Sequence, residues 1–332
     1  MKYARARVIP PLFFLIIVSL ILIIPNHVYA DELIVTTNYS SYSLGATVNV
    51  TGKLTLRGIP VTDGLVAVQV DDSQGNVKLL RVIPTGTQPS PWKVRIVSLM
   101  TVDSQDNPKS TFARGVLSFF KVTVENLDIN DVQTMITFDL FDSIGRSVSF
   151  SFWGGNLQAG QRLTRREDIL IPSDFFGNTA TCYVNVLTGN VQPVFPKLAG
   201  QPCCPEQSVS VTITGSSSGS ADSTPVSTAT SPGSYTLAFK LPDDAILGNY
   251  TVYSSARYNA WTATKFDYYW LITDVNRDGK VNIVDVSAAG RAFGSKAGGP
   301  KYNAMVDINN DGIVNIIDLA TIARDFGRAI VQ

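Results

Sequence analysis

The sequence predicts a mainly β chain in which two β-sandwiches, one inserted in the other, precede a small all-α C-terminal module with two repeated polar loops. Three observations carry this prediction. Closely spaced runs of β-branched and aliphatic residues fill most of residues 31–270. The first and last of these β stretches are each too short for a sandwich, but together they approach the usual size of about 100 residues. A twelve-residue pattern of oxygen-bearing side chains then occurs twice near the C-terminus.

The first 30 residues have the pattern of a secretory signal peptide. Lys2, Arg5 and Arg7 precede an apolar run over residues 12–24, and the small residue Ala30 suits signal peptidase cleavage. The apolar run is shorter than the about 20 residues that a membrane-spanning helix needs. We therefore expect a secreted or cell-surface protein that contacts the membrane only if this signal is retained.

Charge and histidine content exclude several classes of function. Removal of the signal leaves 24 basic against 27 acidic residues, a net charge of −3, so nucleic acid is not an expected partner. The single histidine, His27, lies in the removed segment. The mature chain therefore has no imidazole for a catalytic triad, a proton shuttle or a transition-metal site.

The β stretches follow one another with clear punctuation. The first stretch, residues 33–82, alternates apolar and polar residues between turn signals such as Asp63-Gly64, so each strand should bury one face. The second stretch is long enough for a complete sandwich, and a segment rich in Ser, Thr and Gly separates it from the third. The expected domains are a signal peptide at 1–30, a split sandwich at 31–90 and 231–272, an inserted sandwich at 91–214, a linker at 215–230 and the C-terminal module at 273–332.

The two outer segments also carry a family resemblance. Gly233-Ser-Tyr-Thr-Leu-Ala-Phe-Lys-Leu-Pro242 and Gly248-Asn-Tyr-Thr-Val252 resemble the closing strands of macroglobulin-like (MG2-type) or bacterial immunoglobulin-like repeats. Tyr42-Ser-Leu-Gly-Ala-Thr-Val-Asn-Val-Thr-Gly-Lys-Leu54 is similar to the way such repeats begin. The resemblance implies that the outer segments are halves of one immunoglobulin-like domain and that a second such sandwich interrupts it. A single irregular β array is the alternative.

Three cysteines remain in the mature chain: Cys182, Cys203 and Cys204. Export to an oxidising compartment predicts one disulfide and one leftover thiol. Adjacent cysteines rarely bridge each other, so we expect Cys182 to pair with Cys203 or with Cys204. A catalytic cysteine is the weaker interpretation, because no histidine is present to activate it.

The motif that carries chemistry lies in the C-terminal module. Residues 274–285 place oxygen-bearing side chains at loop positions 1, 3, 5, 9 and 12 with glycine at position 6, which is the spacing of an EF-hand calcium loop. A hard cation takes six to eight oxygen ligands, and glycine makes the sharp bend easily. With position 7 contributing its backbone carbonyl, the predicted ligands are Asp274, Asn276, Asp278, Lys280, Asn282 and Asp285.

The same pattern returns 33 residues later, so two calcium ions are expected. Residues 274–294 and 307–327 are identical at eleven of 21 positions. Two polar surface turns would seldom repeat a glycine and five donors at the same spacing. The ligands predicted in the second loop are Asp307, Asn309, Asp311, the carbonyl of Ile313, Asn315 and Asp318.

Helical spacing of apolar residues follows each loop, and each helix ends at a glycine suited to a C-cap. No helical pattern precedes the first loop, and position 12 is Asp in both copies. With these features, residues 273–328 resemble a type I dockerin. The resemblance implies that calcium orders the helices and that these bind a cohesin-like domain of an extracellular or cell-surface protein. It also implies partner contacts at loop positions 10 and 11 and at two matching arginines: Ile283, Val284, Arg291, Ile316, Ile317 and Arg324.

The leading functional expectation is a non-catalytic, exported protein that this module attaches to another extracellular protein. One alternative is a glycoside hydrolase, which needs two facing carboxylates, and its candidates are Glu125, Asp139, Asp142 and Glu167. Another is glycan binding on aromatic platforms, with the candidates Trp153, Trp261, Tyr268, Tyr269 and Trp270. Sequons at Asn38, Asn49 and Asn249 suit an exposed glycosylated surface.

Overall fold

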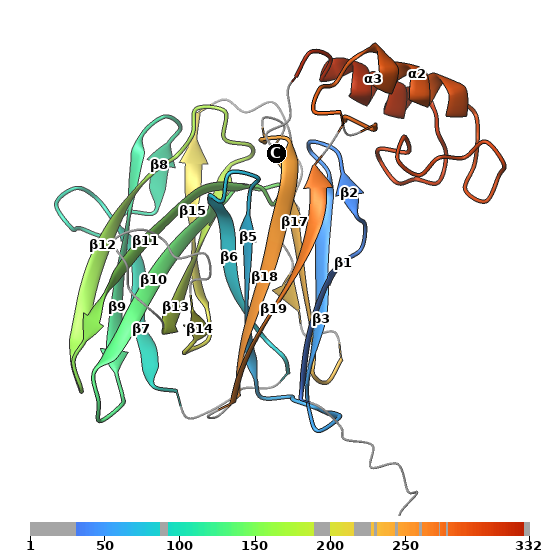
Figure 1. Cartoon of the computed structure of the whole chain (residues 1–332). Helices are drawn as coiled ribbons and strands as arrows, with labels where there is room; N and C mark the ends of the chain where they lie inside the picture. The colour runs from blue at the N-terminus through green and yellow to red at the C-terminus, as the bar shows by residue number, and fades with distance from the viewer. Residues whose placement is uncertain are drawn as a thin grey trace, which may run out of the picture.

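The computed structural model is mainly β, with 53% of residues in strands and 7% in helices, which confirms the predicted fold class. The two helices of the described residues belong to the C-terminal module (Figure 1). The predicted signal peptide lies outside the described residues. Among the residues that are described, no helix has the length and apolar character to cross a membrane. The structure describes residues 31–86, 92–188, 200–215, 227–228, 231–242, 245–258, 261–271, 273–276 and 278–328.

The strands at the two ends of the β region form one two-layer unit, called here the outer sandwich. β17 pairs with β3, and β18 pairs with β5, so strands from both outer segments lie side by side in each sheet. One sheet contains β1 (Glu32–Thr37), β3 (Thr47–Leu56), β4 (Ile59–Pro60), β16 (Ser227–Thr228) and β17 (Ser234–Lys240). The other contains β2 (Ser41–Tyr42), β5 (Leu65–Asp71), β6 (Val77–Pro84), β18 (Gly248–Tyr258) and β19 (Trp261–Leu271).

The intervening strands form a second two-layer unit, the inner sandwich, beside the outer one (Figure 1). Its buried residues form their own core, which includes the central side chains Phe120, Phe138 and Val184. One sheet contains β8 (Thr111–Ala113), β10 (Val132–Phe141), β11 (Ser147–Leu157), β13 (Thr179–Thr188), β14 (Gln201–Pro202) and β15 (Gln207–Thr214). The other contains β7 (Val94–Val102), β9 (Leu117–Asn126) and β12 (Arg162–Leu170). The immunoglobulin-like assignment and the domain boundaries stay predictions.

Close packing in the outer sandwich depends on a glycine opposite a tyrosine. Tyr235 is fully buried, and its hydroxyl donates to the carbonyl of Ile34 at 2.6 Å. Gly52 is the register partner of Tyr235, and a Cβ atom there would overlap both the tyrosine ring and the Ile34 carbonyl. A side chain at position 52 would therefore force the two strands apart.

Three hairpins use the same aspartate-based turn. In each, the aspartate carboxylate accepts from the amides two and four residues later, as Asp72 does from Gln74 and Asn76 at 2.9 Å. Asp103 and Asp142 make the equivalent contacts. This side chain adds to the backbone hydrogen bonds of each turn, which explains why an aspartate begins all three loops.

The two sandwiches are joined along the free edge of β6. Leu80 donates its amide to Asp139 at 3.0 Å, and Val82 donates its amide to Asn185 at 3.0 Å. The Asn185 amide group also donates to the Leu80 carbonyl at 2.8 Å. An edge strand presents unpaired backbone groups, and here side chains of the inner sandwich satisfy them.

A buried ion pair and a small apolar core complete this junction. Arg81 is 1% exposed, contacts Glu206 at 2.7 Å and stacks on the ring of Tyr183. Leu80 packs against Met135 beside this pair. The junction therefore combines a buried ion pair with a small apolar core.

The three cysteines are buried and free, which corrects the predicted disulfide. Cys182 is the register partner of Val209, whereas Cys203 bonds to the carbonyl of Val186. Four residues along a strand span about 13 Å, and a disulfide needs Cα atoms within about 7 Å. Cys182 and the adjacent cysteine pair therefore lie at different levels of β13.

The C-terminal module contains α2 (Ile283–Ala292) and α3 (Ile316–Arg324), each following one of the predicted loops. It lies at the end of the outer sandwich next to β2 (Figure 1). Its buried apolar residues, among them Val281, Val314 and Ile322, belong to the same hydrophobic cluster as the outer sandwich core. The module is thus packed onto the sandwich as well as being connected to it.

Candidate calcium loops and docking face

Both helices begin with the same capping box. Asn282 accepts from the amide of Val284 at 2.7 Å, and Asp285 accepts from the amide of Asn282 at 2.8 Å. Asn315 and Asp318 cap α3 in the same way. Loop positions 9 and 12, which are predicted calcium ligands, therefore also start each helix.

Each loop closes around the carboxylate at position 1. In the first loop Asp274 accepts from the amides of Asp278 at 3.2 Å and Gly279 at 2.8 Å. In the second loop Asp307 makes the same two contacts at 3.2 Å and 2.9 Å. The bend at position 6 uses a left-handed glycine in both copies, with φ 91° at Gly279 and 82° at Gly312.

The buried carboxylates of the loops suit a divalent cation. Asp285 and Asp318 are fully buried, and burial raises the pKa of Asp274 above its usual value. A hydrogen bond from the Asn276 side chain lowers the pKa of the exposed Asp278. Carboxylate, amide and carbonyl oxygens are the donors that calcium prefers. In the described part of the chain, no group of three His, Cys, Asp or Glu side chains is arranged to hold a metal ion. Amides of the first loop donate to Asp274 and Asp285.

Side-chain hydrogen bonds connect the second loop to residues outside it. The Tyr302 hydroxyl donates to Asp307 at 2.6 Å, and the Asn310 side chain donates to the carbonyl of Ser41 at 3.3 Å. Ser41 belongs to β2 of the outer sandwich, and a cavity of about 340 Å³ lies between this part of the sandwich and residues 308–310. The second loop is therefore in direct contact with the sandwich.

The predicted partner contacts are exposed apolar side chains. Ile283 is 64% exposed and Ile316 is 62% exposed, and Val284 and Ile317 are exposed beside them. Phe293 and Phe326 continue the helical spacing of apolar residues in the two copies, yet both are about half exposed, so sequence reasoning missed them as surface residues. Their repetition at the same spacing as the loops was the available signal. Arg291 is exposed, and Arg324 contacts Asp325 at 3.4 Å.

Loop, cap, helix and glycine thus recur with the same geometry in two copies. Residues 272–326 match the family model of the dockerin type I domain. The match lies at the C-terminal end of the chain and confirms the predicted resemblance. Dockerin domains bind calcium and attach to cohesin domains. The roles of individual residues of this dockerin as ligands or contacts stay predictions.

The remaining comparisons add no functional argument for the β region. A search of the curated proteins gives no match. Among solved structures, the C-terminal domain of wzt aligns at TM-score 0.30 and 10% identity, covering 38% of this chain and 77% of that one. The CARDB domain of PF1109 from Pyrococcus furiosus aligns at TM-score 0.26 and 10% identity, with coverages of 39% and 96%. A β-glucosidase from Listeria innocua aligns at TM-score 0.25 and 18% identity, with coverages of 39% and 17%, so this chain spans about a sixth of that enzyme.

The four carboxylates considered for hydrolysis have structural contacts. Glu125 is held between Arg95 and Arg162, and Asp142 forms one of the aspartate turns described above. Glu167 contacts the Ser151 hydroxyl. Asp139 lies in the buried junction between the sandwiches, where burial raises its pKa to about 8.

The aromatic candidates for glycan binding lie in different environments. Tyr269 is fully buried, Trp153 is half-buried under Arg165, and Tyr268 is exposed. The side chains of Trp261 and Trp270 lie outside the described residues.

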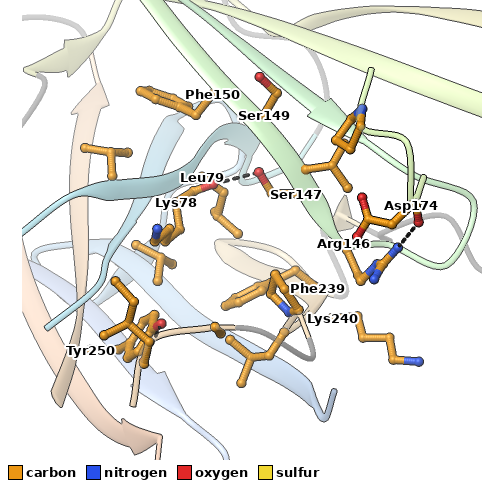
Figure 2. Close-up of a pocket in the computed structure, with 18 of the residues that line it drawn as sticks. Lys78, Leu79, Arg146, Ser147, Ser149, Phe150, Asp174, Phe239, Lys240 and Tyr250 are labelled. Atoms are coloured by element: carbon orange, nitrogen blue, oxygen red, sulfur yellow. Dashed lines mark hydrogen bonds between the residues drawn. The ribbon is translucent and has the colours of Figure 1, made fainter. Parts of the chain in front are cut away.

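A cavity of about 410 Å³ opens where the two sandwiches meet (Figure 2). Lys78, Arg146 and Lys240 stand around it, and the Ser147 hydroxyl bonds to the Lys78 carbonyl at 2.6 Å. Lys78 and Arg146 form ion pairs with Asp72 and Asp142. Two of the three cationic side chains around the cavity are therefore already paired with the aspartates of the neighbouring turns.

Proposed function

We propose that the dockerin attaches this chain to a cohesin-like domain of an extracellular or cell-surface protein, and that it carries non-catalytic sandwiches to that partner. The observation that supports the attachment is the duplicated loop and helix within the matched residues 272–326. Two calcium ions order the two loops in this proposal. Proteins with dockerins are typically extracellular or at the cell surface, in agreement with the signal peptide expected over residues 1–30.

Each loop offers a donor set that fits calcium. Three aspartates, one asparagine, a carbonyl and the position-9 asparagine surround each bend. Bound calcium would neutralise carboxylates that the fold buries, which favours the ordered loop and the capped helix after it. Asp285 and Asp318 would link the ion to the helix start, because each is both the last loop position and a member of the capping box.

The docking face is apolar and duplicated. Ile283 and Val284 on α2 correspond to Ile316 and Ile317 on α3, and all four side chains are exposed. Exposed pairs of branched aliphatic residues suit an apolar partner surface. A partner whose contacts are mainly hydroxyl groups would be a poorer match.

We further propose that the outer sandwich is one immunoglobulin-like domain at 31–90 and 231–272, with an inserted immunoglobulin-like domain at 91–214. Support comes from the pairing of β3 with β17 and of β5 with β18, which unites the two outer segments. Limited proteolysis at residues 215–232 should leave the outer halves associated. Their dissociation would contradict the proposal.

Calcium titration and capture by a panel of cohesin domains would test the attachment. The full chain should bind the panel in calcium and lose binding on chelation, and the Asp274→Ala, Asp307→Ala double variant should not bind. Ile283→Asp with Ile316→Asp should abolish capture without loss of calcium binding. Phe266→Asp is the matched control, because Phe266 is 67% exposed on β19. Capture that persists after chelation, or calcium binding without capture by any cohesin, would refute the attachment.

A further inference from the structure

Two contacts of the second calcium loop have no counterpart among the described residues of the first loop. Within the loops the hydrogen bonds correspond closely, including the 2.8 Å contact from the position-9 amide to the position-12 carboxylate in both copies. The Tyr302 and Asn310 contacts are additional in the second loop, and the residue that matches Asn310 in the first loop, Arg277, lies outside the described residues. The side-chain ligands predicted for the two loops are of the same types, so contacts with the surroundings can distinguish the two sites.

The contact from Asn310 reaches a fixed part of the sandwich. Its acceptor, the carbonyl of Ser41, lies in β2, which pairs with the last residues of β19 through Trp270 and Leu271. β19 leads directly into the first loop. The second loop therefore rests on the same strand pair from which the dockerin begins, and Ile308 beside Asn310 is buried in the shared hydrophobic cluster.

Asn310 also has a backbone conformation that needs support. Its φ of 55° is left-handed, a region that asparagine tolerates better than most residues but that still costs free energy. The bond to Ser41 holds the residue in this conformation in the middle of the loop. The conformational cost of forming the bend is then met when the chain folds, before any ion arrives.

Tyr302 orients the first ligand position of the same loop. Its hydroxyl donates to Oδ2 of Asp307, the oxygen that also accepts from the amide of Gly312. Hydrogen bonds of this kind fix the rotamer of a ligating carboxylate and raise the affinity of a metal site. In the first loop, Asp274 accepts the corresponding hydrogen bond from the amide of Gly279. No tyrosine hydroxyl reaches Asp274 among the described residues.

We propose that the outer sandwich, through Ser41 and Asn310, together with Tyr302, preorganises the second calcium loop, so that calcium fills this loop before the first. The inference rests on the proposed calcium function of both loops. It makes Asn310 and Tyr302 positioning residues rather than ligands. Because linkage is reciprocal, calcium in the second loop also stabilises the contact between that loop and β2.

Single-loop variants of the full chain separate the two sites. Calcium titration by calorimetry of Asp274→Ala reports the second loop, and that of Asp307→Ala reports the first. The second loop should bind more tightly. Asn310→Gly keeps the left-handed backbone and removes only the bond to Ser41, so in the Asp274→Ala chain it should weaken calcium binding roughly three- to tenfold. Tyr302→Phe should weaken it by a similar factor.

The same Asn310→Gly change in the Asp307→Ala chain is the control. That chain reports the first loop, and Asn310 belongs to the second, so its calcium affinity should not change. Hydrogen exchange gives an independent readout: calcium should slow exchange of the Tyr42 amide in the unsubstituted chain, and Asn310→Gly should reduce this protection. Equal affinities of the two loops, or full affinity in Asn310→Gly, would overturn the inference while leaving the calcium function intact. Failure of both single-loop chains to bind calcium would instead reject the proposed function itself.

Discussion

Replacement of Asp139 by asparagine tests whether the junction between the sandwiches contains a neutral carboxylic acid. The Ser147 hydroxyl lies 2.6 Å from both the Lys78 carbonyl and Oδ1 of Asp139. A hydroxyl has one hydrogen, and the carbonyl can only accept, so the proton between Ser147 and Asp139 comes from the carboxyl group. Burial, which raises the pKa of Asp139 to about 8, favours the same neutral form.

The sign of the pH dependence follows from this shift. The folded pKa of Asp139 is above the unfolded value, so its contribution to stability is complete below about pH 4 and is lost as pH rises towards about 8. Within that window the free energy of unfolding should fall by about 1.4 kcal/mol per pH unit on account of this group. An asparagine side chain at this position would keep both hydrogen bonds without titrating, so the variant should gain stability relative to the unsubstituted chain as pH rises.

Urea denaturation of the unsubstituted chain and of Asp139→Asn across this pH range measures the effect. The difference between their free energies of unfolding cancels the contributions of the other titrating groups. Asp139→Leu is the control for lost hydrogen bonding, because it also does not titrate but leaves the Leu80 amide unpaired, so it should be less stable than Asp139→Asn by about 1–3 kcal/mol at every pH. A difference between the unsubstituted chain and Asp139→Asn that does not change with pH would refute a neutral Asp139.

Five further substitutions, at four positions, test the packing. Gly52→Ala should destabilise the outer sandwich by about 1–3 kcal/mol in chemical denaturation, whereas Gly290→Ala, which meets no atom within 4 Å in α2, should stabilise by up to about 1 kcal/mol. Arg114 donates to four carbonyl groups of the inner sandwich, so Arg114→Ala should lower the thermal midpoint, and Arg114→Lys should recover only part of the loss. Glu206→Gln removes the carboxylate partner of the buried Arg81 and should cost about 3–5 kcal/mol by urea denaturation; an unchanged midpoint would contradict a buried ion pair.

The dockerin was predictable because its chemistry is local. Ligand positions, bend glycine and capping residues all fall within twelve residues, so Asp274 and Asp285 identify the loop without knowledge of the tertiary fold. The exposure of Phe293 and Phe326 was not predictable in this way. A helical apolar pattern does not distinguish a face that is buried from a face that awaits a partner.

The junction between the sandwiches and the pairing of the cysteines both depend on residues far apart in the sequence. The junction was not predicted, and the predicted disulfide was wrong. Asp139 contacts Leu80 across 59 residues, and Asn185 contacts it across 105, which no local pattern indicates. The number of cysteines and the expected export predicted a disulfide, but strand register decides whether two cysteines lie close enough to form one. Cys182 and Cys203 lie near the same strand at different levels, a difference that composition does not contain.

The position of β19 determines how tension from a bound partner would enter the molecule. β19 ends next to the dockerin, whereas β1 begins at the opposite end of the outer sandwich (Figure 1). A pull on the dockerin acts along β19, which is bonded to β18 over eleven residue pairs and to β2 on its other edge. All these bonds would be loaded together in shear instead of opening one after another. The attachment strand is thus the part of the fold best arranged to bear mechanical load.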